Sequence, residues 1–120
     1  MGKKTLVLGA STNPERFSYM AVRKLKFSHI PVVAVGLREG EVFGIRIEKP
    51  FPKFEEIDTV TLYIGPKNLP AYYDYILGLR PRRVIFNPGT ESPEFAIILS
   101  ATGIEVVNAC TLIMISNNLY

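Results

Sequence analysis

The sequence predicts an α/β domain built on a doubly wound, parallel, five-stranded sheet in the order 3-2-1-4-5. Three observations lead to this prediction. A chain of 120 residues, 48% hydrophobic and 21% charged, suffices for one folded domain over residues 1–120 and not for two. Short apolar runs alternate with amphipathic ones along the chain. The apolar runs also lack polar alternation, which is typical of parallel strands covered by helices on both faces.

The first half of the chain is expected to contain two buried strands, one helix and a long connection. The strands are predicted at Lys4–Gly9 and Pro31–Gly36, because each is a short apolar run that ends on glycine. A helix is predicted over Ser18–Lys26, where apolar side chains recur at three-residue spacing. The segment Arg38–Phe54 is interpreted as a loop or a short extra strand, since it contains several glycines and prolines.

The second half is expected to contain three strands and three helices. The strands are predicted at Asp58–Ile64, Arg83–Phe86 and Ile104–Val107. The helices are predicted at Asn68–Leu79, from Ser92 to about Thr102, and at Cys110–Ile115.

The single cysteine and single histidine exclude several kinds of site. One Cys and one His form neither a disulfide framework nor a Cys/His zinc cluster, and they argue against a histidine-based hydrolase triad. His29 is expected in a loop or at a helix C-cap, and Cys110 as a buried, inert thiol.

Charge and hydropathy suggest the compartment and exclude some partners. The net charge of +3 divides into +5 for residues 1–50 and −2 for residues 51–120, without the dense basic stripe and aromatic platforms of nucleic-acid binders. The sequence has neither an uninterrupted apolar run of about 18–20 residues nor a signal-peptide pattern. We therefore expect a cytoplasmic protein with neither nucleic acid nor membrane as partner.

The predicted sheet places the candidate site at the carboxyl ends of its strands, where doubly wound sheets bind ligands. Small residues after the first strand allow close approach, free N–H groups at the start of the next helix face an anion, and Arg16 adds positive charge. The candidate residues of this loop are Gly9, Ala10, Ser11, Asn13, Arg16, Phe17 and Ser18.

Three further strand ends complete the candidate site. The second strand ends in Gly36-Leu37-Arg38, with arginine where an NAD site typically has Asp or Glu, so it favours a phosphorylated ribose as in NADP or coenzyme A (CoA). Ile64-Gly65-Pro66 offers a rigid rim for a flat adenine, and Asn87-Pro88-Gly89 offers backbone donors and a small residue. The sequence shows neither a metal-binding nor a catalytic constellation beside these residues.

Four motifs resemble the small single-domain CoA-binding proteins of bacteria, which are related to the CoA-binding domain of the succinyl-CoA synthetase α subunit and have a Rossmann-like fold. The most specific is Val7-Leu8-Gly9-Ala10-Ser11-x-Asn13-Pro14-Glu15-Arg16. The others are the strand Pro31–Gly36, Gly44 followed by Pro50-Phe51, and Asn87-Pro88-Gly89-Thr90. The resemblance extends from about Lys4 to Cys110, nearly the whole chain.

The resemblance implies a cofactor, CoA or an acyl-CoA, and a role for each loop. The segment from Gly9 to Ser18 would hold the pyrophosphate, and Gly36-Leu37-Arg38 would lie near the adenosine, with Arg38 available to its 3′-phosphate. Ile64-Gly65-Pro66 would border the adenine or ribose, and Asn87-Pro88-Gly89 would lie towards the pantetheine arm. The loop motif, the missing carboxylate after the second strand and the lack of catalytic residues together favour non-enzymatic binding of this small nucleotide ligand.

Two alternatives stay open. One is an NADP-binding component of an oxidoreductase, which would need a substrate domain from a partner chain. The other is an interaction subunit with a vestigial phosphate loop, docking through its apolar C-terminal segment and through Tyr72, Tyr73 and Tyr75 unless these tyrosines are core residues. The apolar segment Leu112–Tyr120 also leaves a homodimer open.

Overall fold

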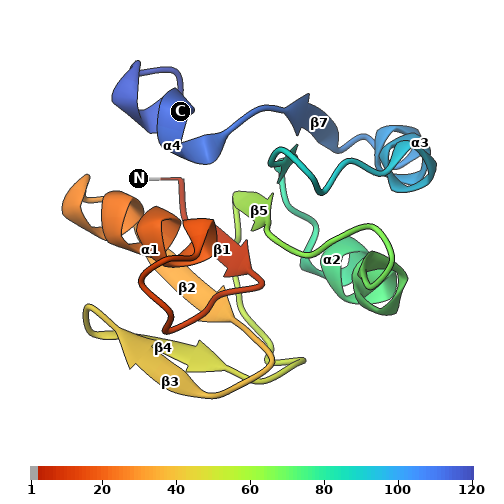
Figure 1. Ribbon diagram of the computed structural model, residues 1–120. Helices are drawn as coiled ribbons and strands as arrows, with labels where there is room; N and C mark the ends of the chain where they lie inside the picture. Colours follow the sequence, from red (N-terminus) through yellow and green to blue (C-terminus); the bar gives the residue numbers. More distant parts are fainter. Residues whose placement is uncertain (1–2) are drawn as a thin grey trace.

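Residues 3–120 are described by a computed structural model, in which helices cover both faces of one mostly parallel sheet (Figure 1). The strands are β1 (Thr5–Leu8), β2 (Val32–Val35), β3 (Gly40–Val42), β4 (Ile45–Glu48), β5 (Thr59–Leu62), β6 (Arg83–Phe86) and β7 (Glu105–Asn108). The helices are α1 (Phe17–Phe27), the 3-10 helix η1 (Leu69–Tyr72), α2 (Tyr73–Leu79), α3 (Pro93–Ala101) and α4 (Thr111–Ser116). The predicted α/β class is confirmed.

The size and order of the sheet differ from the prediction. Within the described residues, seven strands lie in the order β3-β4-β2-β1-β5-β6-β7, and β3 and β4 form an antiparallel pair. The segment predicted as the third strand is β5, which pairs with β1, whereas β4 lies beside β2. The five-stranded 3-2-1-4-5 arrangement is therefore wrong. The six parallel strands, numbered in chain order without β3, instead follow 3-2-1-4-5-6.

The central strand β1 shows why its sequence is apolar without alternation. Leu6 and Leu8 belong to the core cluster that also contains residues of α2 and α3. Val7 points to the other face and packs with Val22 and Leu25 of α1. All of these side chains are fully buried, so every residue of the strand's apolar run is needed by one face or the other.

Most predicted elements are found with slightly shifted ends. The segment Arg83–Phe86 forms β6 as predicted. The helix predicted at Asn68–Leu79 is divided into η1 and α2. Helix α3 begins after Ser92, whose Oγ accepts a hydrogen bond from the N–H of Phe95 at 3.2 Å, as expected for an N-cap.

The segment interpreted as a loop or short strand forms a β-hairpin, β3 and β4. Its two-residue turn consists of Phe43 and Gly44, both with positive φ (52° and 81°), as a tight type I′ hairpin requires. The Phe43 ring packs against Tyr19 and Phe27 of α1, with ring centroids 5.4 and 5.7 Å apart. These contacts hold the hairpin against the helix and place β4 at the side of β2.

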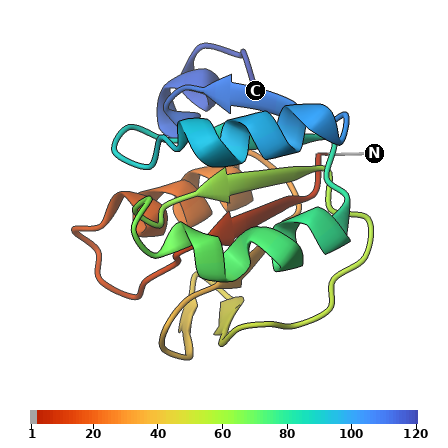
Figure 2. The same cartoon turned by 90° about the vertical axis from the view of Figure 1, so that its right-hand side faces the viewer.

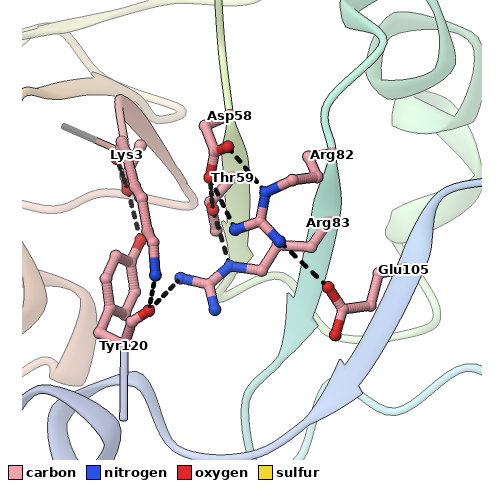
Figure 3. Close-up of polar contacts among 8 residues, drawn as sticks. Lys3, Asp58, Thr59, Arg82, Arg83, Glu105 and Tyr120 are labelled. Atoms are coloured by element: carbon pink, nitrogen blue, oxygen red, sulfur yellow. Dashed lines mark hydrogen bonds and ion pairs between the residues drawn. The ribbon is translucent and has the colours of Figure 1, made fainter. Parts of the chain in front are cut away.

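At the amino ends of the strands, two arginines are used within the structure (Figure 3). Arg82 pairs with Asp58 at 2.9 Å and with Glu105 at 3.2 Å. Arg83 is buried and donates from Nε to Thr59 Oγ1 at 2.8 Å and from Nη2 to the main-chain oxygen of Tyr120 at 3.2 Å. Its guanidinium also lies 4.3 Å from the centre of the Tyr120 ring. At the amino ends of β5, β6 and β7, both arginines are therefore bound by polar groups of the domain itself.

The structure also shows the positions of the histidine, the cysteine and the three tyrosines discussed in the sequence analysis. His29 is exposed, with φ of 61°, directly after the C-cap of α1. Cys110 is half-buried at the N-cap of α4, so the expectation of a buried thiol is wrong. Tyr72, Tyr73 and Tyr75 all pack into the cluster beneath α2 and α3, as core residues do.

Candidate ligand cleft

The carboxyl ends of β1, β2 and β5 surround a cleft of about 880 Å³. In Figure 2 the arrows of β5 and β7 point to the left of the picture, where the loops that follow β1 and β6 lie. The chain leaves β1 for α1 on one face of the sheet and leaves β5 for α2 on the other. The cleft therefore lies at the switch point of the sheet, where such folds bind ligands. Its lining residues are Gly9, Ala10, Ser11, Thr12, Asn13, Arg16, Gly36, Leu37, Arg38, Tyr63, Ile64, Gly65, Asn68, Ala71 and Tyr72.

The loop after β1 is shaped by its own small and polar residues. Gly9 has φ of +100°, and a Cβ there would lie 2.8 Å from the carbonyl oxygen of Tyr63, so glycine is required. Ser11 Oγ accepts a hydrogen bond from the N–H of Asn13, and Asn13 Oδ1 accepts one from the N–H of Glu15, both at 3.0 Å. These side chains fold the loop, a role that sequence reasoning did not separate from ligand binding.

The amino end of α1 opens onto this cleft. Arg16 is its N-cap residue, and no side chain among the described residues caps this helix end. The first turn also contains no acidic residue, so the partial positive charge of the helix end is not offset there. Arg16 lines the cleft, whereas Phe17 is 67% exposed outside its lining and Ser18 is buried beneath the helix.

The loop after β2 brings a second cation to the cleft. A Cβ on Gly36 would overlap the carbonyl oxygen of Ala10 and lie 3.0 Å from Cγ2 of Ile47, so the first two loops touch through this glycine. Exposed Leu37 and Arg38 follow at the cleft. The neighbouring carboxylate, Glu39, pairs with Arg46 of β4 at 3.6 Å and is not among the lining residues.

The segment after β5 forms another wall of the cleft, and several of its lining residues were not predicted from the sequence. Ile64 and Gly65 line the cleft as a pair, but Pro66 does not. Asn68, Ala71 and Tyr72 were not predicted, because their place depends on η1 turning back over the end of β5. Burial raises the pKa of Tyr63 to about 12.

The predicted residues after β6 lie apart from the cleft lining. Asn87 is buried and donates from Nδ2 to Thr61 Oγ1 at 2.7 Å and to the carbonyl of Leu62 at 2.9 Å. Its Oδ1 accepts a hydrogen bond from the N–H of Thr111 at 2.8 Å. Asn87 therefore ties β5, β6 and the start of α4 together, while Pro88 and Gly89 are exposed beside it.

The cleft has a simple chemical character. Among residues 3–120, its lining includes two charged side chains, Arg16 and Arg38, and no Asp, Glu, His or Cys. The described residues also contain no group of three or more His, Cys, Asp or Glu placed to hold a metal ion. No described helix is both long and apolar enough to cross a membrane. Such a cleft is suited to an anion rather than to a metal or a free ribose diol.

Sheet order and cleft define an α/β domain with a mostly parallel central sheet and a basic cleft at the carboxyl ends of its strands. A sequence model of the family described as the CoA binding domain matches residues 3–116. The chain belongs to this family, as its motifs predicted.

Solved structures of other proteins share the fold of this chain. An uncharacterized protein shares 48% sequence identity at a TM-score of 0.97, over 100% of this chain and 99% of that one. A Thermus thermophilus protein (cell-free ID.343) shares 28% identity at a TM-score of 0.86, over 99% and 91% of the two chains. A hypothetical protein from Pyrococcus horikoshii OT3 shares the fold, with 24% identity at a TM-score of 0.85 over 98% and 84%. No curated protein matches the chain.

Proposed function

We propose that this chain binds coenzyme A or an acyl-CoA in the cleft and does so without catalysing a reaction. The observation that carries the proposal is the pair of exposed arginines, Arg16 and Arg38, on a lining that contains no carboxylate. Among the described residues, neither arginine makes an ion pair, so both are available to phosphate groups. The family assignment supports CoA as the ligand.

Each arginine has a distinct part in the proposal. Arg16, together with the uncapped start of α1, binds the pyrophosphate. Arg38 binds the 3′-phosphate of the ribose, since it lines the cleft and makes no ion pair among the described residues. Ile64 and Gly65 border the adenine, and Asn87, outside the cleft lining, donates hydrogen bonds to Thr61 and Leu62 of β5. The lining offers no histidine, cysteine or carboxylate for acid–base or nucleophilic chemistry.

Calorimetric titration with CoA, dephospho-CoA, NADP and NAD tests this proposal. We expect saturable CoA binding, weaker dephospho-CoA binding and no NAD binding. Arg38→Ala should weaken CoA binding about tenfold and leave dephospho-CoA binding unchanged, because only CoA carries the 3′-phosphate.

Lys67→Ala is the matched control, since it removes an exposed cation close to β5 that is not part of the cleft lining. It should change neither affinity by more than about twofold. Equal losses for CoA and dephospho-CoA in Arg38→Ala would remove Arg38 from the proposed role. If NADP binds more tightly than CoA, the proposed ligand is wrong and NADP takes its place.

A further inference from the structure

The wall of the cleft after β5 contains a side-chain amide that the fold does not use. Asn68 lines the cleft, is exposed and directly precedes η1. Its side chain makes no capping hydrogen bond to that helix, although asparagine is among the residues favoured for capping. The other carboxamide of the lining belongs to Asn13, whose Oδ1 accepts a hydrogen bond from the N–H of Glu15 at 3.0 Å. Asn68 therefore brings to the cleft an amide whose donor and acceptor have no partner among residues 3–120.

A tight turn places Asn68 beside the part of the cleft that is proposed for the base. Its N–H donates to the carbonyl oxygen of Gly65 at 3.1 Å, so the chain folds back on itself between these two residues. Ile64 and Gly65 line the cleft and border the adenine in the proposed function. A base that rests on Gly65 would therefore present its edge to the turn that contains Asn68.

The same wall is free of bulky side chains where a base would rest. A Cβ added to Gly65 would find no atom within 4 Å, and the φ of this residue is not left-handed, so the fold itself does not require glycine there. Ala71 lies three residues after Asn68, on the same side of η1, and its small side chain is exposed at the cleft. Small residues of this kind let a flat ring approach the backbone closely.

An apolar side chain lines the cleft from the loop after β2. Leu37 is 81% exposed, although it is large and apolar. Strand β1 separates β2 from β5, so the two loops begin about 10 Å apart, which is two strand spacings. This separation leaves room for a planar base between Leu37 and the wall that contains Gly65 and Ala71. Burial of the leucine side chain against the base would then stabilise the complex.

We propose that Asn68 recognises the base of the ligand and makes the cleft selective for adenine nucleotides over guanine nucleotides. This inference rests on the proposed function of the cleft. Oδ1 of Asn68 accepts a hydrogen bond from the N6 amino group of adenine, and Nδ2 donates to N7, the pairing that asparagine makes with adenine in DNA. Guanine has acceptors at both of these positions, so Oδ1 of Asn68 would be left without a donor.

Titration of the full chain with the 3′,5′-bisphosphates of adenosine and guanosine tests the inference. Both compounds carry phosphates for Arg16 and Arg38, and they differ only in the base. The adenosine compound should bind about tenfold more tightly than the guanosine compound. CoA is titrated alongside, because its binding measures the proposed function itself.

Two substitutions of Asn68 supply the second arm of the experiment. Asn68→Ala should weaken binding of CoA and of the adenosine bisphosphate about tenfold and remove the preference for adenine. Asn68→Lys should reverse the preference, since lysine donates to N7 and O6 of guanine, and a merely structural role of Asn68 would not produce this reversal. Asn117→Lys is the matched control, because it adds the same charge at an exposed asparagine after α4, outside the cleft lining. It should change the base preference by less than about twofold.

The outcomes separate the two proposals. Binding of CoA with no preference between the two bisphosphates would overturn the role of Asn68 and leave the CoA cleft in place. An adenine preference that survives Asn68→Ala, or CoA binding that this substitution leaves unchanged, would also overturn it, since the base would then be recognised elsewhere. If neither CoA nor either bisphosphate binds, both proposals are wrong.

Discussion

The arginines at the two ends of the parallel strands differ in whether other residues of the domain bind their side chains. At the amino ends, Arg82 is held by Asp58 and Glu105, and buried Arg83 is held by Thr59 and Tyr120 (Figure 3). At the carboxyl ends, Arg16 and Arg38 are exposed and line an open cleft. The comparison shows that the position of a cation in the fold, more than its presence, decides whether it stabilises the domain or is available to a ligand.

Two glycines at the carboxyl ends differ in the same way, since Gly36 is in close contact with its neighbours and Gly65 is not. Substituting them gives the largest expected effect on stability. Gly36→Ala places a methyl group against the carbonyl of Ala10, so it should lower the free energy of unfolding by about 3 kcal/mol. Gly65→Ala should change it by less than about 0.5 kcal/mol, because no atom lies within 4 Å of a Cβ at that position. Urea denaturation of both variants measures the difference. Similar losses in the two variants would mean that the loops after β1 and β2 do not touch through Gly36.

Arginine substitutions test the comparison directly, with an intermediate effect. Arg83→Met should lower the free energy of unfolding by about 2 kcal/mol, since Thr59 and Tyr120 lose a buried, charged donor. Arg38→Met should lower it by less than about 0.5 kcal/mol. Thermal or urea unfolding compares the two. A stable Arg83→Met variant would contradict the structural role given to the amino ends.

The smallest expected effect concerns acid. Burial alone would raise the pKa of Asp58, but hydrogen bonds from Arg82 and Thr59 and the nearby arginine charges outweigh it and lower the pKa below 3.8. A carboxyl with a lowered folded-state pKa contributes stability above its unfolded pKa, and this contribution disappears as the pH falls through the folded value. Asp58→Asn should therefore cost under about 1 kcal/mol at pH 7 and less than that at pH 2, where the carboxyl is closer to or below its folded-state pKa. Urea unfolding of both proteins between pH 2 and 7 measures this, and an equal difference at both ends of the range would rule out the proposed linkage.

The sequence predicted correctly those elements that depend on neighbouring residues, and it predicted less well those that depend on contacts distant along the chain. The run Arg83–Phe86 is a strand as expected, because it contains Val84, Ile85 and Phe86, residue types that are enriched in strands. The hairpin β3–β4 was only partly foreseen, since its turn uses Phe43 at positive φ and is held by aromatic contacts with α1. The prediction of the sheet order was wrong for the same reason. The strand beside β2 is β4, which is short and half-exposed, and its own residues do not indicate which strand it pairs with.

The candidate site shows the same limit. The loops after β1 and β2 were found because glycines and arginines follow apolar strands directly, and the structure brings them to one cleft. Asn68 and Tyr72 could not be found in this way, since they reach the cleft only through the path of η1. Asn87 looked like a ligand contact in sequence, whereas its amide is used by Thr61 and Thr111, which are remote along the chain.

The two outer strands of the sheet have a consequence for how copies of this chain can associate. Strands β3 and β7 are three and four residues long, and each carries an exposed carboxylate, Glu41 and Glu105. Short, charged outer strands discourage backbone pairing between molecules and so oppose edge-to-edge aggregation. Contact between two copies is therefore less favourable through these outer strands than through the helices and loops.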